Sequence, residues 1–332
     1  MSTAGPIGII GGGAWGTALA ETLCRAGHEV RLWARNPAVV AEINARHTNT
    51  GYLPGVSLDP ALRATTDLAP IAGLGLVLIV TPAQQMRAVL DDMRGAVKPG
   101  TPLVICSKGI EQPTGKRLTE VLAETIPAAV PAVLSGPSFA HDVVRGLPAA
   151  LTIATADPAL GRHLAERIGD RLFRLYWNDD LTGVQLGGAV KNVLAIAAGI
   201  LDGRGLGASA HAALVTRGFA ELRRFAEDQG ARADTLMGLS GLGDLLLTCG
   251  SVQSRNMSLG RALGQGTPLA NILAARKSVS EGVHTATAVA AIAKARGLDL
   301  PVASAVAAIV AGRLTIDAAI DGLLARPFKA ED

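Results

Sequence analysis

The sequence predicts an α/β N-terminal domain built on a doubly wound parallel sheet, followed by an all-α C-terminal domain. A glycine-rich turn stands at residues 11–16, between an apolar run and a helical segment. Apolar runs then alternate with helical segments as far as about residue 178, and segments rich in Ala, Leu and Gly with helical spacing follow. At 332 residues the chain exceeds what one hydrophobic core organises, so we expect domains at 1–178 and 179–332.

The glycine-rich turn lies where a first strand passes into a first helix. Pro6–Ile10 is a short apolar strand candidate, Ala14–Ala26 a helix closed by Gly27, and Glu29–Trp33 a second, alternating strand. The turn itself reads Gly-Gly-Gly-Ala-Trp-Gly from Gly11, which contains the spacing Gly-x-Gly-x-x-Gly. This context predicts a Rossmann-type dinucleotide site, although glycine triplets alone are usually ordinary turns.

Each glycine of the motif has an expected role. Gly11 would allow the tight turn, Gly13 the close approach of a pyrophosphate, and Gly16 the close packing of helix on strand. The helix N-terminus would add unpaired N–H donors and a favourable dipole for the phosphates.

The end of the second strand bears on the choice of cofactor. An NAD-specific site usually carries a carboxylate there for the ribose 2′-hydroxyl, but this chain continues Ala34-Arg35-Asn36-Pro37. A guanidinium suits a 2′-phosphate because its planar fork donates two parallel charged hydrogen bonds. We therefore expect NADPH to be preferred, with NAD possible; the alternative is that Arg35 is a solvated loop residue.

Five further apolar runs are predicted strands of the same sheet: Leu76–Val80, Leu103–Cys106, Ala132–Ser135, Ala149–Ala154 and Leu172–Tyr176. In doubly wound sheets, ligands bind at the carboxyl ends of the strands. Thr81, Lys108 and residues 136–138 follow such ends.

After Asn178 the pattern is helical. Asp179 or Asp180 is a suitable N-cap for a helix running through Lys191, and residues 326–332 read as a frayed tail. Further helices are expected at 209–229, 254–264, 284–296 and 302–311.

Composition excludes several functional classes. The net charge of +3 contains no block of like charges, so nucleic acid and anionic membranes are not expected partners. The longest apolar stretches are too short for a bilayer span, and the short N-terminal lead leaves no room for a signal peptide. Three scattered cysteines and the spacing of six histidines suggest no disulfide framework and no metal. A cytoplasmic location is expected.

The second domain carries the residues that could perform chemistry. Lys191 and Asn192 follow Gly187-Gly188, and such small residues let a ligand or another backbone come close. The alternative is a surface lysine on an Ala-rich helix. Lys can serve as a proton donor because its pKa is tunable, whereas that of Arg is too high. Ser254 can cap a helix whose first turn presents Arg255 and Asn256, a good phosphate cradle.

These clusters together resemble one family, the bacterial NAD(P)-dependent glycerol-3-phosphate dehydrogenases, over nearly the whole chain. The motifs that carry the resemblance are Gly-Gly-Gly-Ala-Trp-Gly-Thr-Ala-Leu-Ala from Gly11, Ser-Lys-Gly-Ile-Glu from Ser107, Ser-Gly-Pro-Ser-Phe-Ala from Ser135, Lys-Asn-Val-Leu-Ala-Ile-Ala-Ala-Gly from Lys191, Gly-Leu-Gly-Asp-Leu-Leu-Leu-Thr-Cys from Gly241, Ser-Arg-Asn from Ser254 and Val-Ser-Glu-Gly from Val279.

The resemblance implies interconversion of dihydroxyacetone phosphate and sn-glycerol 3-phosphate for phospholipid synthesis, by a cytoplasmic homodimer. It implies that Lys191 is the catalytic acid/base. It implies substrate contacts from Lys108, Gly136, Ser138, Asp244, Ser254, Arg255 and Asn256. The expected cofactor contacts are Gly11, Gly13, Ala14, Gly16, Arg35 and Asn36 and, through the resemblance, Trp15, Lys108, Ala140, Arg255, Val279 and Glu281. Because family members vary at Arg35 and Asn36, the resemblance alone leaves NAD against NADP open.

Hydride addition to C2 of the ketone makes its oxygen alkoxide-like, so a proton or a cation is needed there. Lys191 can polarise and protonate that oxygen, and Lys108 can add a second positive field. We expect Asp244 to keep Lys191 protonated at neutral pH. Two alternatives remain: another hydroxyacid-type reductase, which would need no phosphate cradle, and a non-catalytic nucleotide sensor, which would need neither Lys191 nor Asp244.

Overall fold

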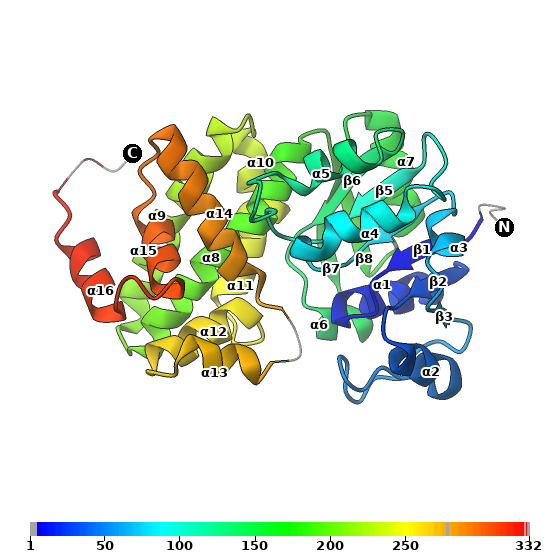
Figure 1. Cartoon of the computed structure of the whole chain (residues 1–332), viewed down its shortest axis with the longest axis horizontal. Helices are drawn as coiled ribbons and strands as arrows, with labels where there is room; N and C mark the ends of the chain where they lie inside the picture. Colours follow the sequence, from blue (N-terminus) through cyan, green and yellow to red (C-terminus); the bar gives the residue numbers. More distant parts are fainter. Residues whose placement is uncertain (1–4, 277–278, 329, 331–332) are drawn as a thin grey trace. The chain divides into compact units, whose positions relative to one another are not determined.

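The computed structural model describes residues 5–276, 279–328 and 330 (Figure 1). The chain divides into two compact units. The first unit comprises Met1–Ser107 and Leu118–Leu181, and the second comprises Lys108–Arg117 and Thr182–Asp332. Residues 108–117 lie within the range expected for the first domain but belong to the second unit, because a ten-residue excursion of the chain leaves no mark in composition or periodicity. Of the expected frayed tail, residues 329, 331 and 332 lie outside the described residues.

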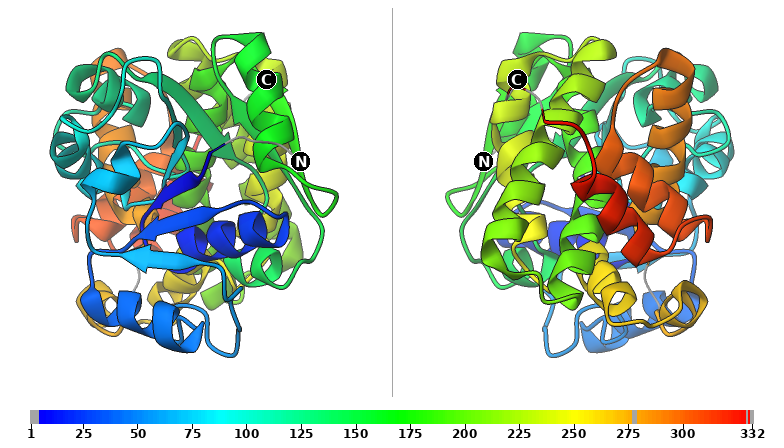
Figure 2. Two further views of the ribbon diagram at one scale, coloured as in Figure 1. Left: turned by 90° about the vertical axis from the view of Figure 1, so that its right-hand side faces the viewer. Right: turned by 90° about the vertical axis from the view of Figure 1, so that its left-hand side faces the viewer.

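In the described part of the first unit, eight strands form one sheet in the order β3-β2-β1-β4-β5-β6-β7-β8. The left-hand view of Figure 2 shows β1, β2 and β3 side by side in shades of blue. All neighbours pair in parallel except β6 and β7, which are antiparallel. The strands are β1 (Ile7–Ile10), β2 (Val30–Trp33), β3 (Arg63–Thr65), β4 (Val77–Ile79), β5 (Pro102–Ile105), β6 (Val130–Ser135), β7 (Ala149–Ala154) and β8 (Phe173–Asn178).

The predicted strands are confirmed, with ends that differ by one or two residues, and β3 is an addition. This strand has three residues at the edge of the sheet, reading Arg-Ala-Thr, which is too short and too polar to form an apolar run. The chain moves from β1 to β2 in one direction and from β4 to β5 in the other. Because βαβ crossovers are right-handed, the connecting helices cover opposite faces, and the order reverses between β1 and β4, where ligands bind in such sheets.

Among the helices of the first unit, α1 packs with α6 and α4 packs with α5. The predicted first helix is confirmed, ending one residue early at Arg25. The helical segments are α1 (Ala14–Arg25), α2 (Pro37–Arg46), α3 (Ala69–Ala72), the 3-10 turn Ala83–Gln85, α4 (Met86–Met93), α5 (Leu118–Thr125), α6 (Ala140–Val144) and α7 (Pro158–Ile168).

The described second unit contains helices and one isolated bridge, between Ile110 and Arg117, but no strand. The right-hand view of Figure 2 shows the helices from α9 in green to α16 in red. They are α8 (Leu181–Gly203), α9 (Gly207–Asp228), α10 (Ala233–Met237), the π-helical turn Leu239–Gly243, α11 (Asp244–Cys249), α12 (Arg255–Gly264), α13 (Leu269–Ala274), α14 (Glu281–Arg296), α15 (Pro301–Val310) and α16 (Ile316–Leu324).

The long predicted helices are confirmed, whereas α10, α11, α13 and α16 are short and were not expected. The expected helix at 284–296 begins earlier, at Glu281. Short helices lack the several turns over which an apolar period becomes visible, so packing rather than pattern defines them.

Helix α8 is the core helix of the second unit. By length and composition it could cross a membrane, but its most apolar stretch is completely buried in the protein. Backbone contact fixes its crossing with α12: a Cβ on Gly199 would lie 2.1 Å from the carbonyl oxygen of Met257, and one on Gly260 would lie 2.1 Å from that of Ile196. Only glycine permits such an approach, and it ties the N-terminus of α12 to the middle of α8.

Candidate functional site

In the first unit, the glycine-rich turn has the geometry of a phosphate cradle. Gly11 has φ +127°, and a Cβ there would lie 2.7 Å from the carbonyl oxygen of Val80. A Cβ on Gly16 would lie 1.9 Å from the carbonyl oxygen of Gly11, so helix and turn touch through backbone. Gly13 is different, since a Cβ there would meet nothing within 4 Å. Gly11 and Gly16 are thus required by packing, while Gly13 leaves space open beside the start of α1.

The first turn of α1 presents backbone donors to that space. Gly13 is the N-cap and supplies no side-chain hydrogen bond, and the first turn carries no acidic residue. Ala14 and Trp15 follow, and the buried indole Nε1 of Trp15 has no hydrogen-bond partner among the described residues. A helix N-terminus of this kind favours an anion, which fits the pyrophosphate of a dinucleotide.

Arg35 and Asn36 follow β2. Arg35 is exposed, and its Nη1 lies 3.5 Å from Oε1 of Gln85. The side chain of Asn36 caps α2, accepting a hydrogen bond of 2.9 Å from the N–H of Ala38. The amide oxygen of Asn36 is therefore engaged in the helix cap, whereas its amide nitrogen and the Arg35 guanidinium are the donors that follow β2.

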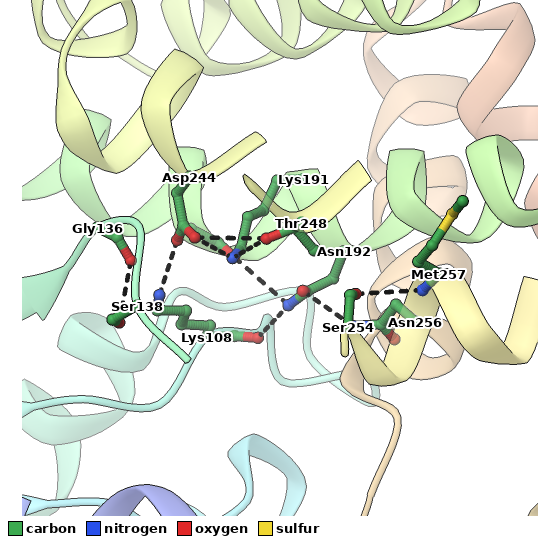
Figure 3. A network of polar contacts seen from close by, with 11 residues as sticks. Lys108, Gly136, Ser138, Lys191, Asn192, Asp244, Thr248, Ser254, Asn256 and Met257 are labelled. Carbon is green, nitrogen blue, oxygen red and sulfur yellow. Dashed lines mark hydrogen bonds and ion pairs between the residues drawn. The ribbon is translucent and has the colours of Figure 1, made fainter. Parts of the chain in front are cut away.

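Gly136, Ser138 and Ala140 follow the carboxyl end of β6. Gly136 has φ +151°, and a Cβ there would lie 2.8 Å from Cα of Leu151, so the close packing on β7 requires glycine. The hydroxyl of Ser138 donates to the Gly136 carbonyl at 3.2 Å (Figure 3). Ala140 is the first residue of α6.

Residues 108–117, here called the crossing segment, are held by the second unit through hydrogen bonds along their length. Nδ2 of Asn192 donates to the carbonyl oxygen of Lys108 at 3.1 Å. Oε1 of Gln112 lies 2.8 Å from Nδ1 of His284, and Nη1 of Arg117 donates to the Thr182 hydroxyl at 2.8 Å. These contacts place Lys108 beside α8 in the second unit.

The crossing segment completes a cluster of charged side chains, shown in Figure 3, that we call the lysine–aspartate cluster: Lys108, Lys191, Asp244 and Thr248. The Asp244 carboxylate is 0% exposed and accepts from both ammonium groups, with 2.7 Å between its Oδ2 and Nζ of Lys108. Nζ of Lys191 also donates to the Thr248 hydroxyl at 2.6 Å. Lys191 is only 5% exposed, which excludes the interpretation of a surface lysine.

Local backbone geometry brings Asp244 to Lys191. A Cβ on Gly187 would lie 2.7 Å from the carbonyl oxygen of Ser240, so the missing side chain lets the π-helical turn approach α8. A Cβ on Gly241 would lie 1.9 Å from the carbonyl oxygen of Leu236, which makes the tight turn glycine-dependent as well. Asp244 then opens α11 facing Lys191, and π-turns are often found at functional sites.

Burial and, to a smaller extent, the nearby positive charge of Lys108 lower the pKa of Lys191 to about 7, against the opposing attraction of Asp244. The expectation that Asp244 keeps Lys191 protonated at neutral pH stays a prediction, because a pKa of about 7 leaves both forms present there. Asp244 does favour the ammonium form, but removing a charge from water costs more than this one carboxylate, shared with a second lysine, restores. A pKa near neutrality suits a group that gives and takes a proton.

A chain of amide hydrogen bonds lies next to the lysine–aspartate cluster. The N–H of Gly282 donates to Oδ1 of Asn256 at 3.1 Å, and Nδ2 of Asn256 donates to Oδ1 of Asn192 at 2.9 Å. Asn192 in turn holds the Lys108 carbonyl. The chain joins α14, α12, α8 and the crossing segment, and buried amides that are satisfied in this way fix the relative positions of these elements.

The N-terminus of α12 is capped as expected. The buried Ser254 side chain accepts from the N–H of Met257 at 3.2 Å. Arg255 is exposed in the first turn and interacts electrostatically with Glu281, the first residue of α14. Arg276 donates to the Arg255 carbonyl at 2.6 Å. This first turn therefore offers a cation and helix N–H groups to an anion.

Sequence reasoning gave no role to Thr248 and Asn192, both of which the structure joins to the proposed site residues. Thr248 stands four residues after Asp244, and the i, i+4 spacing on one helical face was a usable signal. Asn192 directly follows Lys191, and its role depends on partners 64 and 84 residues away in the chain.

Val279 is half-buried just before α14. The described residues include no group of three His, Cys, Asp or Glu side chains suited to a metal ion.

Comparisons with known proteins match both parts of the chain. The model of the NAD-dependent glycerol-3-phosphate dehydrogenase N-terminus matches residues 6–161, and that of the C-terminus matches residues 180–321. The glycerol-3-phosphate dehydrogenase [NAD(P)+] of Parvibaculum lavamentivorans is 55% identical over 325 residues, and that of Caulobacter vibrioides 56% identical over 325 residues; each alignment covers 98% of both chains. The crystal structure of the Coxiella burnetii glycerol-3-phosphate dehydrogenase superimposes with a TM-score of 0.93 at 39% identity, covering 97% of this chain and 99% of that one.

Proposed function

Because this chain belongs to the NAD-dependent glycerol-3-phosphate dehydrogenase family, and is thus an oxidoreductase, we propose that it reduces dihydroxyacetone phosphate to sn-glycerol 3-phosphate reversibly. The observation that carries the proposal is the lysine–aspartate cluster: a buried lysine with a pKa of about 7, held by a carboxylate and a hydroxyl. Such a group supplies and accepts the proton that carbonyl reduction and alcohol oxidation require.

The first unit fits a dinucleotide. Open space at Gly13 and the uncapped N-terminus of α1 suit the pyrophosphate, and the exposed Arg35 supports a preference for NADPH over NADH. When bound, the nicotinamide supplies or accepts the hydride. Glycine-turn residues Gly11, Gly13, Ala14, Trp15 and Gly16 would form this site, with Arg35, Asn36, Lys108, Ala140, Arg255, Val279 and Glu281 as further contacts.

In the reaction we propose, Lys191 donates its proton to the oxygen on C2 of the ketone and takes it back in the reverse direction. Lys108 stabilises the developing negative charge, and Asp244 holds both ammonium groups in position. Thr248 accepts a hydrogen bond from Nζ of Lys191, which restricts where the remaining proton of that group can point. The near-neutral pKa allows both directions to proceed at physiological pH.

The substrate phosphate would be held by the first turn of α12. Arg255 supplies the charge, Asn256 and the capped helix N-terminus supply N–H groups, and Ser254 fixes the cap. Gly136 and Ser138 would contribute further substrate contacts from the first unit. When the phosphate is held, C2 of the ketone is oriented for hydride transfer. Binding energy at the phosphate thus accelerates the reaction at C2. This cradle is what distinguishes the proposal from a reductase of unphosphorylated hydroxyacids.

We further propose that the enzyme works as a cytoplasmic homodimer that supplies phospholipid synthesis. Family membership supports this part of the proposal, and size-exclusion chromatography with light scattering tests the dimer directly.

A spectrophotometric assay tests the function. Purified protein is mixed with NADPH or NADH, and cofactor oxidation is followed with and without dihydroxyacetone phosphate, with dihydroxyacetone as a matched ketone that lacks phosphate. We expect rapid oxidation only with the phosphorylated ketone, and faster with NADPH. Equal rates with both ketones would indicate a generic reductase, and cofactor binding without turnover would indicate a nucleotide sensor.

A further inference from the structure

The loop between α2 and β3, residues 47–62, packs on the glycine-rich turn of the first unit through one amide side chain. Asn49 is 1% exposed, and its Nδ2 donates to the carbonyl oxygen of Gly12 at 3.0 Å and to the hydroxyl of Thr17 at 2.8 Å. A carbonyl oxygen can only accept, so the atom that faces Gly12 must be the amide nitrogen. Asn49 thus connects the glycine-rich turn, at Gly12, with the first helical turns of α1, at Thr17.

The loop that presents Asn49 is itself fixed at both ends. It starts at His47, which has φ +52° and is the only non-glycine residue in the described chain with a positive φ. Oε1 of Glu42 accepts from the Thr48 hydroxyl at 3.0 Å and from the N–H of Thr50 at 2.7 Å. Near the other end, Oε2 of Glu21 accepts from the N–H of Asp59 at 2.6 Å. Glu21 belongs to α1, so the loop and the helix that follows the turn are tied together.

The contact with Gly12 sets the direction of the next N–H group. The peptide between Gly12 and Gly13 is planar and trans, so the N–H of Gly13 points opposite to the Gly12 carbonyl and therefore away from Asn49. Gly13 is the glycine that faces open space at the start of α1. A Cβ on Gly12 would lie only 2.5 Å from Cβ of Ala34, so the close approach of the turn to the end of β2 requires glycine at this position.

We propose that Asn49 is a positioning residue for the dinucleotide: by holding the Gly12 carbonyl, it aims the N–H of Gly13 at the pyrophosphate. This inference rests on the dinucleotide site proposed above. Asn49 is buried behind the turn and acts through the peptide rather than by touching the cofactor. Its Oδ1 has no hydrogen-bond partner among the described residues, so the contacts that define this position are the two that Nδ2 donates.

The proposal makes a specific distinction between cofactors. The pyrophosphate is common to NADH and NADPH, so loss of the Asn49 contact weakens both by the same factor. Arg35, in contrast, concerns the 2′-phosphate of NADPH alone. A role in overall stability without positioning would lower the melting temperature and leave both affinities unchanged.

Asn49→Asp replaces the donor by a carboxylate of nearly the same shape, which repels the Gly12 carbonyl. Asn44→Asp is the matched control, because Asn44 lies on the preceding helix and exchanges two hydrogen bonds of 2.9 Å with the backbone of Ala64 in β3, away from the turn. Affinities for NADH and NADPH are measured by fluorescence titration of the reduced cofactors. Melting temperature and the turnover number at saturating cofactor are measured on the same samples.

For Asn49→Asp we expect both dissociation constants to rise by about tenfold or more, and equally, with turnover at saturation changed by less than about twofold. For Asn44→Asp we expect a lower melting temperature and unchanged affinities. Unchanged affinities in folded Asn49→Asp would overturn the proposal, as would an equal loss in the control.

If Asn49→Asp does not fold, Asn49→Ala decides, because it removes the donor without adding charge. We expect both affinities to fall by about threefold or more, and unchanged affinities would again overturn the proposal. Wild-type protein that binds neither cofactor would instead overturn the proposed function, so the two failures are distinguishable.

Discussion

The glycine-rich turn of the first unit is made of backbone, whereas the lysine–aspartate cluster of the second unit is made of charged side chains. At the turn, Gly13 leaves open space and α1 begins without a side-chain cap. In the cluster, an aspartate with no solvent exposure holds two lysines. The turn favours an anion through fixed backbone dipoles and uses no charged side chain. The cluster keeps ionisable groups out of water, so the pKa of Lys191 reaches the neutral range.

This difference predicts how each region responds to mutation. A side-chain change in the cluster removes chemistry, whereas a side-chain change near the turn alters only affinity or selectivity for the cofactor. The five predictions below test that contrast, beginning with the largest expected effect.

Replacing Lys191 should separate chemistry from binding. Lys191→Met keeps most of the side-chain volume and removes the proton donor, so the turnover number should fall by about 100-fold or more. NADPH affinity and melting temperature should change little. Lys98→Met, at an exposed lysine of the first unit, is the control and should behave as wild type. Near-normal turnover in folded Lys191→Met would remove Lys191 from the proposed role.

Arg255 tests whether the α12 N-terminus holds phosphate. Arg255→Ala should lower kcat/KM for dihydroxyacetone phosphate by about 2–4 kcal/mol, because a charge contact to the phosphate is lost. With dihydroxyacetone, a poor substrate for both proteins, the change should be small. NADPH affinity is measured separately and its change subtracted, since Arg255 is also a proposed cofactor contact. A loss of the same factor with both ketones after that correction would refute the cradle.

Arg35 tests the part of the cofactor site that does use a side chain. Arg35→Asp should raise KM for NADPH by about tenfold to a hundredfold and leave KM for NADH nearly unchanged, because a charged contact is replaced by a repulsive one. Both constants are obtained from initial rates at saturating ketone. Equal changes for the two cofactors would exclude Arg35 from the 2′-phosphate site.

The pH dependence of turnover should report the pKa of Lys191. Reduction needs the ammonium form, so its rate should fall as pH rises above about 7, approaching tenfold per pH unit. Oxidation needs the neutral amine, so its rate should fall as pH drops below about 7. Rates in both directions across this range check the signs. Parallel profiles in the two directions would contradict a single group that serves both.

The smallest effect is expected at Glu221. This residue tests whether burial shifts the pKa of an ionisable group elsewhere in the second unit, as it does at Lys191. Its carboxylate is 5% exposed and accepts from the N–H groups of Val302 and Ala303 at the start of α15. Burial raises its pKa to about 7, against the lowering effect of those hydrogen bonds. Folding thus favours the protonated form of Glu221. The resulting stabilisation of the folded protein is fully present below about pH 4.5 and is lost as pH rises through about 7.

Glu221→Gln removes that titration. The change in the free energy of unfolding between about pH 5 and pH 8, measured by urea denaturation, should become smaller by on the order of 1 kcal/mol. Every other ionisable group is the same in both proteins, so the difference between the two proteins isolates Glu221. An unchanged pH dependence would show that Glu221 keeps its ordinary pKa.

The sequence by itself determined the features that depend on neighbours along the chain. Apolar runs predicted six of the eight strands in the sheet, and the alternation of polar and apolar residues predicted β2, because both patterns are local to the strand. The glycine spacing predicted the turn, since a positive φ at Gly11 and a contact of backbone with backbone at Gly16 both exclude a side chain. The Ser254 cap was equally visible, because it joins residues three apart.

Tertiary structure decided what joins residues distant in sequence. Asp244 meets Lys191 and Lys108 across 53 and 136 residues, and no local period encodes such meetings. The transfer of residues 108–117 to the second unit follows from hydrogen bonds to Thr182, Asn192 and His284, which composition cannot reveal. The pKa of Lys191 depends on tertiary structure for the same reason: its carboxylate partner could be identified from the sequence, but the burial that opposes this partner exists only after folding.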